Sequence, residues 1–256
     1  MIRAIGAGCA HQLRMMRGTP DWFLALFTTP LLTAVFLTIF QASARQDLTT
    51  YAVLAPALMA LWTMSLQTAG ELISQERENG SLEALLAAPA PFAAVLFGRI
   101  GAVTLVSLVA FVEAWLVGWL LTGAPLPVPH PVLFVLTVAA TTWSMTGWAG
   151  VMACVFVLAR SARTFQNSLS YPFFVLGGVL VPVALLPDWL SWPARAVFLS
   201  WSADLLRDSL DAAPVVMAGG RLLIVAALGA AGYVLSHALL TRTLRRVRTT
   251  GRLAHA

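Results

Sequence analysis

The chain has 256 residues, of which 59% are hydrophobic and only 11% are charged. Soluble domains carry about 25% charged residues, and a mean hydropathy of +0.82 likewise excludes an ordinary soluble globule. The net charge of +5 does not indicate nucleic acid, because the basic residues lie between apolar runs and at the C-terminus. All sixteen are arginine, and without lysine the chain has no phosphate-binding loop of the G-x-x-x-x-G-K-S/T type.

Six apolar stretches are long enough to cross a bilayer, because about 20 residues at 1.5 Å each cover about 30 Å of hydrocarbon. They predict an all-α polytopic membrane protein in which residues 1–256 form one transmembrane domain. The predicted spans are residues 22–42, 51–73, 94–122, 131–159, 166–187 and 219–241.

The arginines predict the orientation of these spans. With a cytoplasmic N-terminus, the outer side receives four of the sixteen arginines, namely Arg45, Arg195, Arg207 and Arg221. Basic residues favour cytoplasmic loops, so we expect both termini in the cytoplasm.

The residues before the first span have a helical apolar pattern. Ile2, Ile5, Cys9, Leu13 and Met16 recur at helical spacing among arginines. This pattern predicts an amphipathic helix on the cytoplasmic surface over residues 2–17, with an ordinary polar tail as the alternative.

A long segment from Pro182 to Val216 separates the last two predicted spans and is too polar to cross the membrane. Its tryptophans, Trp189, Trp192 and Trp201, are typical of the headgroup level. We therefore expect short interfacial or re-entrant helices here, on the outer side and shielded by protein.

An acidic segment follows the second predicted span, on the cytoplasmic side. Asn79-Gly80 indicates a chain reversal, after which Ser81 can cap a short helix that carries Glu83 in its first turn and stops at Pro89. The apolar stripe of this helix consists of Leu82, Leu85 and Leu86. Such a helix is suited to docking in a groove of a partner protein; a solvated loop is the alternative.

Two motifs resemble those of type-2 ABC export permeases, such as the daunorubicin-resistance and nodulation-exporter membrane subunits. The first is Glu76-x-Glu78-x-Gly80-Ser81-x-Glu83-x-Leu85-Leu86-x-x-Pro89. The second is Gly177-Gly178-x-Leu180-x-Pro182, then Leu186-Pro187-x-Trp189-Leu190 and Asp204-Leu205-Leu206-Arg207. The chain departs from the family in having Ser81 where Thr is more usual, and in lacking the Asn-Pro that family members often have near Leu199-Ser200.

The resemblance implies six transmembrane helices, an N-terminal interfacial helix, a cytoplasmic coupling helix and outer re-entrant helices between spans five and six. The coupling helix would contact an ABC ATPase through Glu76, Glu78, Gly80, Ser81, Leu82, Glu83, Leu85 and Leu86. The outer re-entrant region would include Pro187, Trp189, Asp204 and Arg207.

The same resemblance implies a transport subunit and not an enzyme. ATP and magnesium would bind to the partner ATPase, and this chain would bind no cofactor. A second permease subunit would complete a homodimer or a paralogous heterodimer in the bacterial plasma (inner) membrane. The expected function is export of a hydrophobic or amphipathic substrate (a drug, lipid or glycan), with multidrug resistance as one possible role.

Glu113 lies inside the third predicted span, where an acid costs about 2.5–3.5 kcal/mol on insertion scales. It is a candidate for the translocation pathway; pairing with a neighbouring helix or a place near the outer interface are the alternatives. No metal site is expected, because Cys9, Cys154 and the four histidines lack ligand spacing.

Three other functions have sequence signatures that can be compared with this chain. An ion-coupled secondary transporter predicts ionisable residues near the midplane of two repeated halves, whereas one acid lies well inside a span and no repeat is visible. An intramembrane enzyme needs a nucleophile and a base within reach of each other, and no such cluster is visible. A haem-exporter permease shares the six-span plan and remains an alternative.

Overall fold

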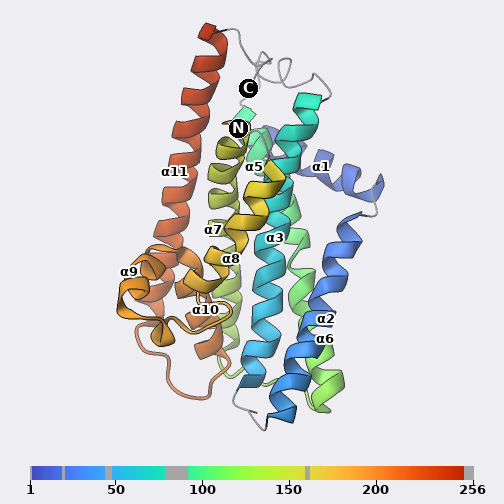
Figure 1. The fold of residues 1–256 in the computed structure, drawn as a ribbon, viewed down its shortest axis with the longest axis vertical. Helices are drawn as coiled ribbons and strands as arrows, with labels where there is room; N and C mark the ends of the chain where they lie inside the picture. The colour runs from blue at the N-terminus through green and yellow to red at the C-terminus, as the bar shows by residue number, and fades with distance from the viewer. Residues whose placement is uncertain (1, 19–20, 44–47, 79–91, 159–161, 251–256) are drawn as a thin grey trace.

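The computed structural model describes residues 2–18, 21–43, 48–78, 92–158 and 162–250, and this part is helical without strands (Figure 1). Its elements are α1 (Ile2–Gly18), α2 (Asp21–Ala42), α3 (Thr49–Glu78), α5 (Phe92–Val106), α6 (Val109–Thr122), α7 (Pro131–Leu158), α8 (Ala162–Leu176), η2 (Val183–Leu185), α9 (Asp188–Ala196), α10 (Phe198–Ser209) and α11 (Ala218–Thr250).

Four segments of the described chain are long and apolar enough to cross a membrane: Thr49–Leu66, Ala93–Thr122, Pro131–Phe156 and Ala218–Arg242. The prediction of an all-α, multi-pass membrane protein is therefore confirmed. The apolar part described for α2 is the shorter Phe27–Ala42, and α8 has 15 residues. The count of six spans accordingly stays a prediction.

The predicted span 94–122 consists of two consecutive helices, α5 and α6. Between them the amide of Leu108 donates to Leu105 (3.2 Å) and that of Phe111 donates to Leu108 (3.0 Å), a spacing of three residues instead of four. The Ser107 hydroxyl donates to the carbonyl of Thr104 at 2.8 Å and so competes for the helical acceptors. This contact gives a physical reason for the local tightening of the helix.

The predicted span 166–187 is wrong at its C-terminal end, because α8 stops at Leu176. Gly178 has a φ of 64°, and the amides of Gly178 and Val179 donate to the carbonyls of Val175 and Phe174. This is the Schellman arrangement that ends many helices with a left-handed glycine. Because the hydrophobic run continues past Gly178, a prediction from apolarity alone overestimated the length of the helix.

α3 and α7 form the centre of the bundle. α2, α6, α5 and α8 pack against α3, while α11, α10 and α5 pack against α7. The core contains Trp62, Met145, Phe174 and Phe198, which belong to four different helices. We call the end where α6 stops and α7 starts the distal end, and the end that carries α1 the proximal end (Figure 1).

α1 is a helix, as predicted, but its buried face matches the predicted apolar stripe only in part, at Met16. Ile5 and Leu13 are exposed, whereas Gly8 is buried against the backbone of Val95 in α5. A Cβ added to Gly98 would likewise collide with the backbone of Ile5. Two facing glycines thus let α1 and α5 approach closely, and backbone proximity outweighs side-chain hydrophobicity at this crossing.

Candidate functional site

The predicted coupling segment from Gly80 to Pro89 lies outside the described residues. Of the residues predicted to contact the ATPase, Glu76 and Glu78 have a described backbone, near the C-terminal end of α3, but their side chains are not described. The prediction that these residues contact an ATPase therefore stays a prediction.

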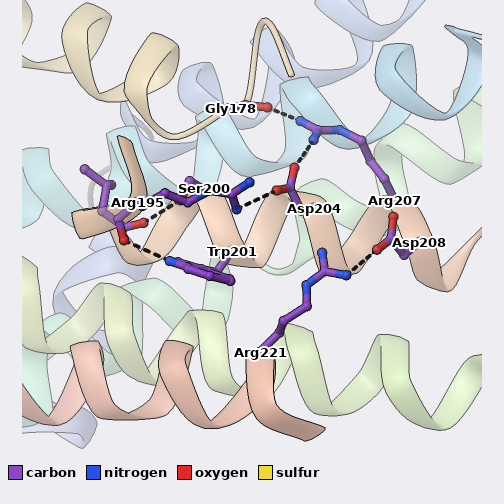
Figure 2. Close-up of polar contacts among 9 residues, drawn as sticks. Gly178, Arg195, Ser200, Trp201, Asp204, Arg207, Asp208 and Arg221 are labelled. Carbon is purple, nitrogen blue, oxygen red and sulfur yellow. Dashed lines mark hydrogen bonds and ion pairs between the residues drawn. The ribbon is translucent and has the colours of Figure 1, made fainter. Parts of the chain in front are cut away.

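A set of charged side chains gathers around α10 in the half of the bundle farther from α1 (Figures 1 and 2). We call it the distal polar network, and its members are Arg195, Asp204, Arg207, Asp208 and Arg221. Its three guanidinium groups face two carboxylates, which leaves one net positive charge. The amide of His130, just before α7, donates to Ser209 at the end of α10, which places that end of α10 at the distal end.

Arg207 is the most buried charge of this network, with 11% of its side chain exposed. Its guanidinium donates to Asp204 at 3.0 Å and to the carbonyl of Gly178, and lies 4.3 Å from the ring centre of Tyr51. Because Asp204 is three residues earlier on α10, this pair is also held by helical spacing. Arg207 thereby joins α10 to the end of α8 and to the start of α3.

The electrostatics of Arg207 reflect this position. Burial lowers the pKa of its guanidinium, while the nearby Tyr51, Asp204 and Asp208 act in the opposite direction. Arginine stays charged in proteins, so the cation is kept at the cost of desolvation. Its hydrogen bonds and ring contact offset that cost only while all partners are present.

Arg195 and Arg221 extend the network to the flanking helices. Arg195 in α9 pairs with Asp204 at 3.3 Å, stacks 4.8 Å from the centre of Trp201, and accepts a hydrogen bond from the Trp201 indole through its backbone carbonyl. Arg221, near the start of α11, pairs with Asp208 at 2.5 Å. Figure 2 shows how these contacts converge on one helix. α10 is thus connected by charged groups to α3, α8, α9 and α11.

The structure separates the four residues predicted in the outer re-entrant region. Asp204 and Arg207 meet in the network, but Pro187 caps α9 with its carbonyl, and Trp189 is 74% exposed. Sequence reasoning missed Tyr51, Arg221 and Asp208 as partners. The three-residue spacing of Asp204 and Arg207 on α10 was a signal in the sequence for their ion pair. Nothing in the sequence indicated that the ring of Tyr51 would lie against the guanidinium of Arg207.

Glu113 lies on α6, where the neighbouring Val112 and Leu116 are exposed. Its Oε2 atom is shielded and has no hydrogen-bond partner among the described residues. The structure thus pairs Glu113 with no polar group of the described helices, and its role stays open. Among the described residues, no cluster of His, Cys, Asp and Glu is arranged to hold a metal ion.

The sequence model of the ABC-2 type transporter family matches residues 5–210. The chain belongs to this family. The match runs from α1 to the end of α10 and so includes every network residue except Arg221. No curated protein matched the chain. As an ABC-2 permease, the chain is a membrane-embedded transport subunit of a kind that works with an ATPase partner, and the resemblance expected from the two sequence motifs is confirmed.

Proposed function

We propose that this permease is the transmembrane subunit of an ATP-driven exporter that moves a hydrophobic or amphipathic substrate, such as a drug, lipid or glycan, out of the bacterial cytoplasm. The family match is the observation that carries the proposal. ATP and magnesium bind to a separate ATPase subunit, in accord with the absence of lysine from this chain. A second permease subunit, identical or paralogous, completes the transmembrane unit.

The proposal assigns the coupling contact to the segment after α3. At 1.5 Å per residue, the 30 residues of α3 extend about 45 Å, against about 30 Å of hydrocarbon. The surplus belongs to its polar C-terminal end, which includes Glu71, Glu76 and Glu78. A continuous helix of this kind can carry a movement of the coupling segment, with Glu83 and Leu85 at its centre, into the bundle.

The proposed orientation places both termini and the proximal end in the cytoplasm, so the plasma membrane's outer leaflet surrounds the distal end. Three of the four arginines assigned to the outer side, Arg195, Arg207 and Arg221, belong to the distal polar network. The other twelve arginines then lie on the cytoplasmic side, which is the bias that cytoplasmic loops show.

Glu113 is proposed to line the translocation pathway. Its shielded and unpartnered carboxylate oxygen supports this role, because an acid inside a span is retained at an energetic cost. Replacement by glutamine, which keeps the shape, separates a charge requirement from a packing role. We expect Glu113→Gln to lower substrate transport while leaving the protein folded and bound to its ATPase.

The test of the coupling contact uses any ABC ATPase that is encoded beside this chain. Both proteins are expressed together, purified and placed in nanodiscs, and their co-elution and ATP hydrolysis are measured. Glu83→Arg with Leu85→Asp should abolish both, because it reverses the charge and breaks the apolar stripe of the coupling helix.

The matched control is Asp211→Arg, a charge reversal at an exposed position at the distal end, which should change neither readout. If the double variant co-elutes and hydrolyses ATP as the unmodified protein does, the coupling assignment is wrong. If transport by the unmodified protein follows a proton gradient without any ATPase, the chain is a secondary transporter and the exporter proposal fails.

A further inference from the structure

The third predicted span is interrupted where α5 passes into α6, and an acid lies just beyond the interruption. The amides of Leu108 and Phe111 donate to carbonyls only three residues earlier, which is the 3₁₀ spacing. A tight turn of this kind inside a long helix often marks a functional position. Glu113 follows the turn by two residues, near the start of α6. This part of the span is therefore a candidate binding position.

Glu113 has no cationic partner in the part of the chain that the structure describes. Its Oε2 atom is shielded and without a hydrogen-bond partner there, and the ion pairs of the described residues are those of the distal polar network. An acid inside a span is kept at an energetic cost, and its charge is balanced by a partner. Since none of the described arginines supplies that balance, the acid is available to a positive group from outside the chain.

α2, which packs against α6, carries a second polar atom without a partner. Thr29 is 1% exposed, and its hydroxyl makes no hydrogen bond to a described residue. Thr33, one turn later on the same helix, donates its hydroxyl to the carbonyl of Thr29 at 2.8 Å. A threonine inside a helix is commonly satisfied in this way. The buried Thr29 hydroxyl is an exception to that pattern and is free to bind a ligand.

The two helices place these groups at a similar level of the bundle. α2 and α6 both run toward the distal end and stop there (Figure 1). Glu113 lies nine residues before the end of α6, Thr33 lies nine residues before the end of α2, and Thr29 is one turn farther from that end. These levels fall within the apolar segments Ala93–Thr122 and Phe27–Ala42. We call Thr29, Thr33 and Glu113 the α2–α6 polar site.

The surroundings of Glu113 fit a ligand that has an apolar body and a positive head. Val112 and Leu116, which flank Glu113 on α6, are 67% and 49% exposed. The acid thus borders an apolar surface that a molecule dissolved in the membrane can reach. A cationic head would pair with the carboxylate, whereas a neutral amphiphile would leave it unpaired and an anionic one would be repelled.

We infer that the α2–α6 polar site binds the cationic head of an amphipathic substrate, so that this permease takes hydrophobic cations in preference to neutral or anionic amphiphiles. The Glu113 carboxylate pairs with the positive charge. The Thr29 hydroxyl accepts a hydrogen bond from an N–H group when the head is an ammonium. The inference rests on the proposed function in treating the ligand as a substrate, but the binding itself needs no ATPase.

The test measures binding to the full chain in nanodiscs, without an ATPase. The probes are radiolabelled tetraphenylphosphonium and tetraphenylborate, which have nearly the same size and shape but opposite charges. Partition into nanodiscs without protein is subtracted from each measurement. We expect the chain to bind tetraphenylphosphonium at least about tenfold more tightly than tetraphenylborate, because only the cation is attracted by the carboxylate.

Four variants assign the preference to the site. Glu113→Gln keeps the shape and should weaken binding of the cation about tenfold, whereas Glu113→Asp keeps the charge and should retain the preference. The matched control, Asp211→Asn, removes an acid at an exposed distal position and should change nothing. Thr29→Val should weaken binding of dodecylammonium about threefold but leave that of dodecyltrimethylammonium, which has no N–H group, unchanged.

Two results would overturn the inference: equal binding of the two tetraphenyl ions by the unmodified chain, and a cation preference that Glu113→Gln leaves in place. Equal effects of Thr29→Val on both ammonium probes would refute the hydrogen bond assigned to Thr29. Failure of the exporter proposal is seen separately, in ATP-driven uptake of tetraphenylphosphonium by vesicles that contain the chain and its ATPase. Binding that depends on Glu113 without such uptake would refute the exporter proposal alone.

Discussion

Replacing Arg207 with alanine removes three contacts of one buried side chain: the ion pair with Asp204, the hydrogen bond to the Gly178 carbonyl and the ring contact with Tyr51. Breaking a buried ion pair by removing one partner costs about 3–5 kcal/mol. Asp204 keeps Arg195 as a partner at 3.3 Å, so the lower part of that range applies to the pair.

The other two contacts add to the loss. An unsatisfied buried carbonyl costs about 1–3 kcal/mol, and Gly178 is a buried residue at the end of α8. The cation–π contact contributes about 0.5–2 kcal/mol. The three terms overlap and the alanine removes a costly desolvated charge, so we expect a net loss of about 2–4 kcal/mol in the free energy of unfolding.

The assay is SDS titration of the purified protein in mixed micelles, followed by tryptophan fluorescence, which gives the free energy of unfolding. Arg207→Lys should cost less than alanine, because an ammonium keeps the charge but cannot bridge Asp204 and the Gly178 carbonyl with a planar fork. Arg195→Ala is the matched control. Its side chain is 45% exposed, and half-exposed pairs contribute about 0–1 kcal/mol.

The loss of unfolding free energy should be largest for Arg207→Ala, intermediate for Arg207→Lys and smallest for Arg195→Ala. If Arg195→Ala lowers the free energy of unfolding as much as Arg207→Ala does, the burial of an arginine does not determine how much it stabilises the protein. If Arg207→Ala leaves the unfolding free energy within about 0.5 kcal/mol of the unmodified value, the Arg207 contacts drawn in Figure 2 contribute no net stability and the expected loss is refuted.

The remaining predictions concern positions where the backbone or a hydroxyl decides the packing. Gly178→Ala should lower the stability of the protein more than the matched Gly123→Ala. Both glycines have positive φ, which costs a non-glycine residue about 1–2 kcal/mol, but only at Gly178 would the new methyl also approach another side chain, at 2.9 Å. Thermal unfolding of the two variants measures the difference. Gly98→Ala should loosen α1 from α5 and speed proteolysis near the N-terminus, whereas Gly6→Ala, where the added methyl meets nothing within 4 Å, should not. Ser144→Ala removes a 2.8 Å hydrogen bond to a carbonyl of α11 and should lower the unfolding free energy by about 0.6 kcal/mol in the SDS titration.

Each of these expectations has a contrary result. Equal melting temperatures for the alanine variants of Gly178 and Gly123 would mean that the crowding at Gly178 relaxes without cost. Unchanged proteolysis of Gly98→Ala would contradict the close approach of α1 and α5. A Ser144→Ala variant as stable as the unmodified protein would show that its hydroxyl contributes no net interhelical energy.

Part of the site could be predicted from the sequence because it depends on local spacing. The three-residue interval between Asp204 and Arg207 predicts a pair on one helix, and the acidic motif before Pro89 led to the family that the sequence match confirms. The partners from other helices could not be predicted. Tyr51 lies more than 150 positions before Arg207, and only the packing of α10 beside α3 brings the ring over the guanidinium.

The sequence by itself determined that this chain is a helical, multi-pass membrane protein of the ABC-2 family, because the length and apolarity of its segments suffice for a bilayer and its motifs are local. Only the tertiary structure decided where helices end and which faces meet. The apolar run through Gly178 continues in composition while the backbone turns left-handed there and ends α8. The crossing of α1 and α5 forms at Gly8 and Gly98, because the absence of side chains at both positions lets the two backbones approach closely, while Ile5 and Leu13 stay exposed.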